Sequence, residues 1–291
     1  MIVTEGTIVK GIGGFYYVKT ADKTYQCKAR GIFRKDGTVP FVGDLVEIEP
    51  LNDDEAVITR ILPRKNQFIR PPVANVDCLI ITAALKKPEL NLYIIDKFLV
   101  MAEYHHTEIG ICLNKIDLAE PGEVDAFLEI YEGLYPVLCV SGKTGEGLDG
   151  LRNFLAGKKS AFAGPSGVGK STLLNRLADT VNVETGEISE KSQRGKHTTR
   201  HVELFRLSDD SMIFDTPGFT SFEVLDAEEQ ELAFLYPEMA PFIGQCKYYN
   251  CRHVSEPGCM VRVAAEEGTI HTSRYNSYCK QMKEIQEMRK Y

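Results

Sequence analysis

Long apolar runs are scarce in this sequence. The longest, at about residues 78–85, is far shorter than the roughly 20 residues that a membrane-spanning helix needs. The first residues also lack the charged and then apolar pattern of a secretory signal peptide. We therefore expect no membrane contact and a cytoplasmic location.

Patterns typical of disulfides and of a wholly basic surface are missing as well. Four of the eight cysteines lie singly in apolar segments, as reduced core residues do: Cys27, Cys78, Cys112 and Cys139. The formal charge of −7 argues against a basic nucleic-acid coat, so any RNA contact must use local patches. What the chain does have is 291 residues with 43% hydrophobic content, which is enough for two or three domains.

A glycine-rich loop organises the sequence. It has the pattern G-x-x-x-x-G-K-S and follows a short apolar segment at residues 160–163. Glycines let backbone N–H groups converge on a phosphate, and the helix that begins at Lys170 adds its positive N-terminal dipole. In such loops the lysine reaches the β- and γ-phosphates, and the Ser171 hydroxyl binds magnesium. The pattern predicts a nucleoside triphosphate site made of Gly164, Pro165, Ser166, Gly167, Val168, Gly169, Lys170, Ser171 and Thr172.

The first 65 or so residues form short segments typical of β-strands, which are separated by turns containing Gly, Asp and Asn. Their spacing predicts a small five-stranded barrel of the OB type, which we expect over residues 1–68. Residues 28–35 carry four cations and no acid, with Phe33 among them. Basic and aromatic residues on a barrel suit an RNA strand, and a solvated loop with a core phenylalanine is the alternative.

Arg70, Pro71 and Pro72 indicate a linker, because adjacent prolines forbid a helix and interrupt a strand. The pattern then changes to alternating strands and helices, among them an apolar strand at 76–82 and a helix at 92–104. We expect an α/β domain with a parallel sheet over residues 69–222.

A strand at 109–113 leads into the quartet Asn114-Lys115-Ile116-Asp117. The carboxyl end of a parallel strand is where an α/β sheet binds its ligand. Asp117 can accept hydrogen bonds from N1–H and the amine of guanine, which adenine does not offer in that pattern. Lys115 would lie along the base, and Asn114 would brace the pocket. The quartet predicts a guanine site, although four such residues also occur by chance.

Three further motifs complete a GTP site. Ser141, Gly142 and Lys143 follow a strand at 136–140, and their backbone N–H groups could meet the guanine O6. Downstream, residues 194–200 have the composition of a switch segment in which Thr198 or Thr199 completes the magnesium shell. In Asp215-Thr216-Pro217-Gly218, Asp215 would hold magnesium through water, and the Gly218 N–H would sense the γ-phosphate.

The residue after this last motif is Phe219, where Ras-like enzymes have a glutamine that orients the attacking water. An apolar side chain cannot position water, so we expect slow basal hydrolysis. His197 is the local candidate for the missing catalytic group, alongside Lys170, Thr198 and Thr199; a merely structural role for His197 is the alternative.

Three of the remaining four cysteines cluster near the C-terminus. Three thiols and an imidazole occur within a short, loop-rich segment, in the spacing C-x4-C-x-H-x5-C. A closed tetrahedral zinc site needs four such ligands and no open position. The spacing predicts one structural zinc held by Cys246, Cys251, His253 and Cys259.

We expect a helical zinc domain over residues 223–291, with helices at about 227–236 and 270–290 flanking the cluster. The second helix carries cations that could meet RNA phosphates, and a solvated amphipathic face is the alternative. These cations are Arg274, Lys280, Lys283, Arg289 and Lys290.

The order of the motifs is unusual, because the guanine motif precedes the phosphate loop instead of following it. The sequence thereby resembles the circularly permuted GTPases of the RsgA (YjeQ/YloQ) family over essentially its whole length, from the barrel to the cysteine cluster. Permutation is physically permissible because the termini of a compact domain often lie close together.

The resemblance implies a GTPase that uses Mg2+ and one structural zinc ion, binds the 30S ribosomal subunit and its 16S rRNA, and assists late maturation of that subunit. It also supports the catalytic role of His197. We expect a monomer whose hydrolysis is stimulated by 30S particles. The alternatives are a nucleotide-sensing RNA-binding scaffold and a GTPase that acts on another RNA particle, such as tRNA or the large subunit.

Overall fold

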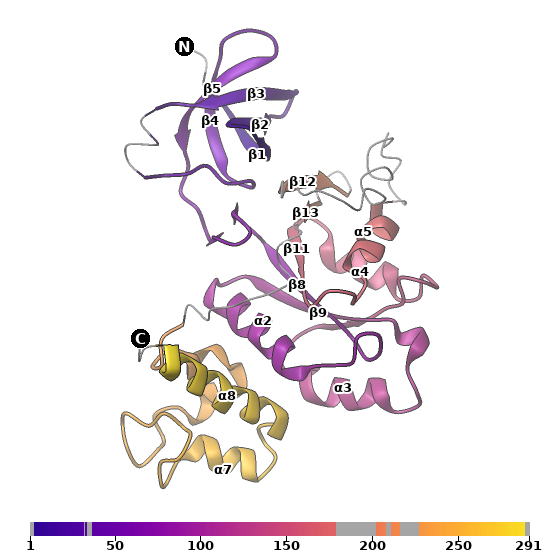
Figure 1. The fold of residues 1–291 in the computed structure, drawn as a ribbon, viewed down its shortest axis with the longest axis vertical. Coiled ribbons are helices and arrows are strands. Elements are labelled where there is room, and N and C mark those ends of the chain that lie inside the picture. Colours follow the sequence, from indigo (N-terminus) through magenta and orange to yellow (C-terminus); the bar gives the residue numbers. More distant parts are fainter. Residues whose placement is uncertain are drawn as a thin grey trace. The chain divides into compact units, whose positions relative to one another are not determined.

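The computed structural model describes residues 3–31, 33, 37–178, 202–207, 211–215 and 227–288. The chain forms two compact units, which are described in turn (Figure 1). Unit 1 comprises Met1–Leu79, Arg152–Phe162 and Leu174–Phe219, and unit 2 comprises Ile80–Leu151, Ala163–Leu173 and Thr220–Tyr291. Among the described residues, no helix combines the length and the apolar character that crossing a bilayer requires.

Unit 1 begins with a closed barrel. Its strands are β1 Thr4–Ile12, β2 Phe15–Lys19, β3 Thr24–Ala29, β4 Leu45–Pro50 and β5 Glu55–Ile61. They pair in the order β1-β2-β3-β5-β4, and β1 also pairs with β4 (Figure 1). The β3–β5 pair is parallel and the other barrel pairs are antiparallel. Fully buried residues from every strand, such as Ile8, Val18 and Ile58, fill the interior. The predicted OB-type barrel is confirmed.

The predicted linker forms the turn of a short hairpin, β6 Gln67–Phe68 and β7 Val73–Ala74. Unit 1 also holds β11 Lys159–Ala163, β12 Glu203–Arg206 and β13 Met212–Asp215. β13 runs parallel to β11 and antiparallel to β12, and β12 in turn pairs with β1 of the barrel.

Unit 2 contains the rest of the α/β sheet, in the order β10-β9-β8. Its strands are β8 Cys78–Ala84, β9 Glu108–Asn114 and β10 Val137–Cys139. Every residue of β8 is buried, as expected of a continuous apolar run. The helices of unit 2 include α2 Leu92–Tyr104, η1 Ile116–Leu118 and α3 Glu123–Tyr131. Two further helices, α4 Leu148–Leu155 and α5 Lys170–Ala178, begin in unit 2 and end in unit 1.

The C-terminal segment of unit 2 is helical, but differs from the prediction in one place. Its elements are η2 Leu232–Leu235, η3 Pro237–Phe242, α7 Met260–Glu266 and α8 Thr272–Met288. The continuous helix expected at 227–236 is therefore wrong, because the short 3-10 helix η2 takes only part of this stretch and η3 begins after it. Pro237 disfavours helical backbone at the residue before it, and Tyr236 is extended, with φ −116° and ψ 95°.

The expectation that Arg274 faces RNA is also wrong. Arg274 is fully buried on α8. Its Nε donates to Glu238 Oε1 at 2.7 Å, its Nη1 donates to Asp96 Oδ1 at 2.7 Å, and its guanidinium lies 4.5 Å from the ring centroid of Tyr236. Burial by itself lowers the pKa of Arg274, but the two carboxylates outweigh it and raise that pKa well above its usual value.

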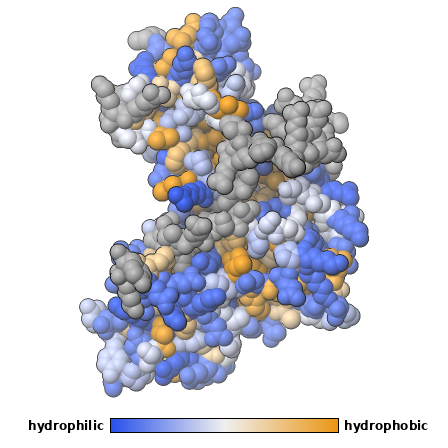
Figure 2. All heavy atoms as spheres, in the orientation of Figure 1, coloured by the Kyte–Doolittle hydropathy of each residue, from blue (hydrophilic) through white to orange (hydrophobic). Residues whose placement is uncertain are grey.

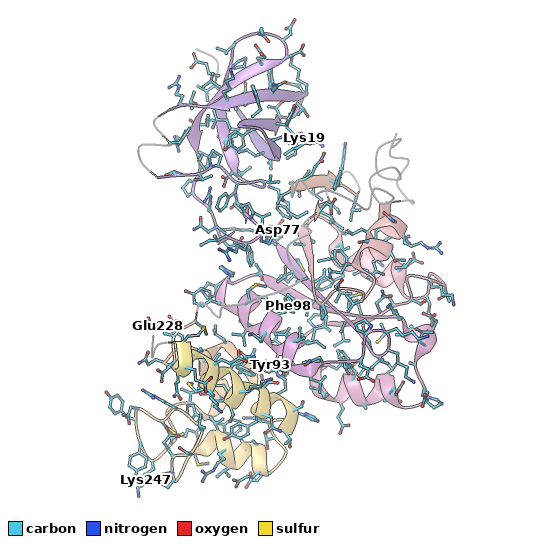
Figure 3. All side chains as sticks on the ribbon, viewed as in Figure 1. Lys19, Asp77, Tyr93, Phe98, Glu228 and Lys247 are labelled. Atoms are coloured by element: carbon cyan, nitrogen blue, oxygen red, sulfur yellow. The ribbon has the colours of Figure 1, made fainter. Side chains whose placement is uncertain are left out.

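This ion pair fixes α8 to α2, on which Figure 3 labels Tyr93 and Phe98. Asp96 and Val100 of α2 lie in the same buried layer as Tyr278 and Met282 of α8. Lys280 also turns back toward α2, 3.7 Å from the Tyr93 ring centroid. The face over the C-terminal helices is largely hydrophilic in Figure 2. Of the other cations expected there, Lys283 lies 3.9 Å from Glu287, and Arg289 and Lys290 are outside the described residues.

We expect Arg274→Met to destabilise the protein by about 3–5 kcal/mol, because it leaves two buried carboxylates without their cation. Lys283→Met is the matched control on the same helix, since its side chain is 76% exposed and its loss should cost no more than about 0.5 kcal/mol. Urea unfolding of both variants measures the difference. Equal free energies of unfolding would show that the buried pair does not stabilise the α2–α8 contact.

Candidate nucleotide site and zinc centre

The phosphate loop runs from the end of β11 to the start of α5, and two of its glycines are required by their neighbours. Gly164 has φ +138° and Gly169 has φ +100°. A Cβ on Gly164 would lie 2.2 Å from the carbonyl oxygen of Thr82, and one on Gly169 would lie 2.3 Å from Nδ2 of Asn114. Only glycine tolerates both the backbone angle and the contact, so the ends of β8 and β9 shape the loop.

Lys170, the first residue of α5, folds back over the loop. Its Nζ donates to the carbonyl oxygens of Gly164 at 2.6 Å and Pro165 at 2.8 Å. Burial lowers the pKa of Lys170 to about 8. A phosphate bound beside this amine would favour its charged form. Ser171 and Thr172 follow on the exposed first turn of the helix.

Asn114 joins the three nucleotide motifs of unit 2. It ends β9 and is 2% exposed. Its Nδ2 donates to the carbonyl oxygen of Val168 at 2.8 Å. Its Oδ1 accepts from the backbone N–H of Lys115 at 2.8 Å and of Gly142 at 2.9 Å. One amide therefore links the phosphate loop, its own quartet and the loop after β10.

Lys115 makes a second link to the phosphate loop. Its backbone is left-handed, with φ 64°, which starts the 3-10 helix η1. Its Nζ donates to the carbonyl oxygen of Gly167 at 2.7 Å and also to that of Lys87. The aliphatic stem of Lys115 thereby spans from the guanine motif to the phosphate loop, which fits the expected place along the base.

Asp117 is held from the loop after β10. Its Oδ1 accepts from the buried Ser141 hydroxyl at 2.6 Å, and Lys143 Nζ lies 4.0 Å from its Oδ2. The Asp117 side chain is 14% exposed, so it is shielded yet reachable. The backbone N–H of Ser141 donates to Glu146, as that of Gly142 does to Asn114, and the proposed contact of this loop with O6 stays a prediction.

The other predicted site residues divide into two groups. Asp215 is the last residue of β13 in unit 1. His197, Thr198, Thr199 and Gly218 lie outside the described residues. Sequence reasoning missed Thr82 and Lys87, which approach the nucleotide motifs through backbone atoms, and such contacts carry no side-chain signal.

The four predicted zinc ligands converge. One ligand atom from each of Cys246, Cys251, His253 and Cys259 lies within 4.8 Å of all the others. His253 Nδ1 is 3.5 Å from Cys246 Sγ and 3.4 Å from Cys259 Sγ, and the two sulfurs are 3.9 Å apart. A tetrahedral zinc site with ordinary bond lengths places its ligand atoms about 3.6–3.8 Å apart. The donor set and its spacing fit zinc.

Neighbouring groups hold these ligands in place. Backbone N–H groups of Met260 and Arg262 donate to the sulfurs of Cys246 and Cys259, at 3.3 and 3.4 Å. Two tyrosines of α8 also donate to the loop that carries the imidazole: Tyr275 to the carbonyl oxygen of His253 at 2.9 Å and Tyr278 to that of Arg252 at 2.6 Å. The ligand loop is thus fixed from the long helix.

The electrostatics of the cluster favour a bound cation. Burial raises the pKa of the Cys251 thiol to about 12 and raises that of Cys259, and burial lowers the pKa of His253. Thiolates are costly here without a compensating positive charge, and a metal ion supplies that charge when it binds.

Comparison with known proteins gives a consistent result. Residues 61–225 match the RsgA GTPase family model, and residues 5–58 match that of the RsgA N-terminal domain. The chain is 45% identical over 287 residues to a small ribosomal subunit biogenesis GTPase RsgA from Caldanaerobacter subterraneus, covering 98% of this chain and 97% of the relative. It is 45% identical over 292 residues to the protein of that name from Alkaliphilus metalliredigens, covering 99% and 100%.

Solved structures agree with this. YjeQ from Thermotoga maritima superposes with a TM-score of 0.87 at 37% identity, covering 98% of this chain and 99% of that one. YloQ, described as a circularly permuted GTPase, superposes with a TM-score of 0.81 at 35% identity, covering 99% and 96%.

We expect nucleotide binding to take up a proton near pH 8. Lys170 has a pKa of about 8 without nucleotide, and phosphate raises it. The affinity for guanosine diphosphate is therefore highest well below pH 8, where Lys170 is already charged before binding. It falls as the pH rises above 8, by roughly tenfold between pH 7 and pH 9. Calorimetry at pH 8 in two buffers of different ionisation enthalpy measures the uptake, about half a proton. In Lys170→Arg the guanidinium stays charged, so this uptake disappears. Binding by the unaltered protein without proton exchange would contradict the assignment.

Cys246→Ala should lose one equivalent of zinc and destabilise the C-terminal segment, because a loop-rich region buries too little apolar surface to fold without its metal. Cys279→Ala is the control, since Cys279 lies on α8 in the same segment and is not one of the four converging ligands. Elemental analysis and thermal unfolding follow both effects. A zinc content equal to that of the unaltered protein in Cys246→Ala would exclude the proposed ligand set.

Proposed function

This chain belongs to the RsgA GTPase family, and from that membership we propose that it acts on the small ribosomal subunit, binding the 30S particle and assisting its late maturation. It is a circularly permuted GTPase, which hydrolyses GTP to GDP and phosphate. The observation that carries the proposal is the Asn114 amide, because it joins the guanine motif to the phosphate loop within one buried network.

The described residues have definite tasks in this proposal. Asp117, held by Ser141, accepts the N1–H and amine of guanine, so GTP is preferred to ATP. Backbone N–H groups of residues 166–169 donate to the phosphates, and Lys170 exchanges its two carbonyl partners for phosphate oxygens. Ser171 and Asp215 are the residues that would hold Mg2+, and a bound Mg2+ would neutralise negative charge on the phosphates.

The hydrolytic step is assigned from the sequence. Phe219 stands where a water-orienting glutamine is found in Ras-like enzymes. We assign the orientation of the attacking water to His197, with Thr198 or Thr199 completing the magnesium shell and the Gly218 N–H sensing the γ-phosphate. Because Phe219 cannot orient water, intrinsic turnover is slow, and 30S contact accelerates it.

Recognition of 16S rRNA is assigned to the barrel and the zinc domain. The barrel offers Lys28, which is exposed and lies 5.2 Å from the ring centroid of Phe15, a pairing suited to RNA. The zinc loop offers the fully exposed Tyr249. We assign residues 1–68 to the barrel, 69–222 to the GTPase domain and 223–291 to the zinc domain of a cytoplasmic monomer.

Single-turnover hydrolysis with and without 30S subunits tests this function. We expect marked acceleration by 30S, none by 50S subunits or tRNA, and co-sedimentation with 30S in a non-hydrolysable GTP analogue. Lys170→Ala is the control that should abolish hydrolysis with or without particles. Binding to 30S without acceleration of hydrolysis would favour a nucleotide-sensing scaffold. Acceleration only by another RNA particle would overturn the assignment of the 30S subunit as the partner.

A further inference from the structure

The barrel is joined edge to edge with the sheet of the GTPase domain. β1 pairs antiparallel with β12, and Lys10 lies opposite Glu203. Their side chains form an ion pair, with 3.1 Å between Nζ and Oε2, and each is 23% exposed. β12 begins directly after the segment that carries His197 and both threonines of the predicted magnesium shell.

A second contact reaches the neighbouring strand. Gly43, in the loop before β4, has φ +96°, and a Cβ there would lie 2.0 Å from the carbonyl oxygen of Ala74 and 2.8 Å from Cζ of Phe214. Phe214 is 1% exposed, and the next residue is Asp215. The barrel loop therefore packs directly against the strand that delivers the predicted magnesium-binding carboxylate.

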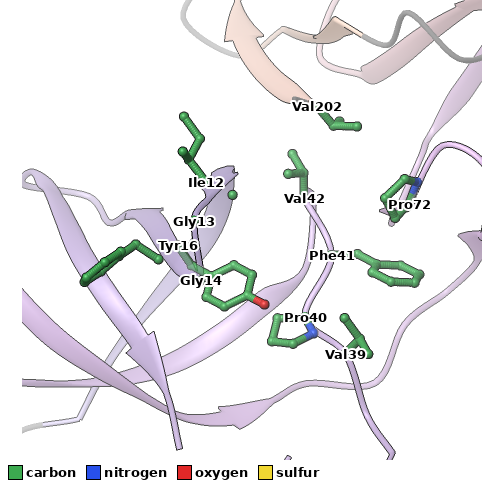
Figure 4. Close-up of a pocket in the computed structure, with 12 residues that line it drawn as sticks. Ile12, Gly13, Gly14, Tyr16, Val39, Pro40, Phe41, Val42, Pro72 and Val202 are labelled. Carbon is green, nitrogen blue, oxygen red and sulfur yellow. The ribbon is translucent and has the colours of Figure 1, made fainter. Parts of the chain in front are cut away.

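A hollow lies beside the paired strands β1 and β12. A cavity of about 260 Å³ lies between the β1–β2 turn, the loop at 39–42, Pro72 and Val202 (Figure 4). Its lining is mostly apolar, with Val42 and Val202 facing each other across it in Figure 4. Val202, the residue before β12, therefore borders open space on the side of the barrel.

We propose that the β1–β12 pair and the Gly43–Phe214 contact position the β12–β13 hairpin, and that they carry the engagement of the barrel by RNA to the catalytic segments at its two ends. This inference rests on the proposed function, since it supplies the route by which the 30S particle accelerates hydrolysis. Lys10, Glu203, Gly43 and Phe214 are positioning residues in this scheme and do not touch the nucleotide.

The physical basis is the pairing of charges across the two strands. Opposite charges placed directly across an antiparallel pair stabilise it, and like charges destabilise it. Lys10→Glu and Glu203→Lys each create a like-charge pair at this edge. They change the net charge in opposite directions, so their effects on simple electrostatic attraction to RNA are opposite.

The experiment measures hydrolysis without 30S, hydrolysis at saturating 30S, and 30S affinity, for both single variants and for the double variant with the charges exchanged. We expect basal hydrolysis and GDP binding to be unchanged, and the maximal acceleration to fall by roughly three- to tenfold in both single variants. The double variant should recover it, since it restores the opposite pair. Thermal unfolding checks that all three variants are folded.

The outcomes separate this inference from the proposed function. Full acceleration of both single variants overturns the inference alone. Changes of opposite sign in the maximal acceleration of the two variants also overturn the inference, because they would reveal simple electrostatic attraction to RNA. If 30S subunits fail to accelerate the unaltered protein, the proposed function fails, and the inference falls with it.

Discussion

Three hydrogen bonds from the buried amide of Asn114 hold the nucleotide site together. They reach Val168 in the phosphate loop, Lys115 in the guanine motif and Gly142 in the loop after β10. Breaking any of them would leave a polar group without its partner in a position shielded from water, which costs about 1–3 kcal/mol. The placement of the guanine motif relative to the phosphate loop therefore depends on one side chain at the end of β9.

The hydrogen bonds of Asn114 also explain how the motifs can come together in the permuted order. The Asn114–Val168 bond joins residues that are 54 positions apart, and it depends on which strand ends meet and not on the order in which the chain visits them. In the permuted chain the guanine motif comes first, the phosphate loop second, and the segments around β12 and β13 come last. β12 pairs with β1 and with β13, which places the barrel beside the β12–β13 hairpin.

Several features could be predicted from the sequence because each depends on local chemistry. The helix at 92–104 has the predicted bounds, the zinc ligands converge, and the glycines of the phosphate loop have the positive φ angles that the motif requires. Arg274 could not be predicted, because only tertiary structure places Asp96 and Glu238 around it, and a cation on an amphipathic helix is ordinarily exposed.

The pairing of β1 with β12 could not be predicted from the sequence either, because an edge contact between distant strands depends on a register that neither segment encodes alone. The same holds for the carbonyl contacts of Thr82 and Lys87, which any residue could provide. The motifs thus identify the chemistry, and the contacts between motifs emerge only from the fold.

The most direct test of the Asn114 network is the GDP affinity of Asn114→Asp. The carboxylate cannot donate to Val168 and faces its carbonyl oxygen, so the affinity should fall by about tenfold or more. Asn66→Asp is the matched control, because the Asn66 amide pairs with the backbone of Val76 in the same manner within unit 1. Its affinity for GDP should stay unchanged even if its stability falls. Equal GDP affinities of Asn114→Asp and the unaltered protein would contradict the central role of this amide.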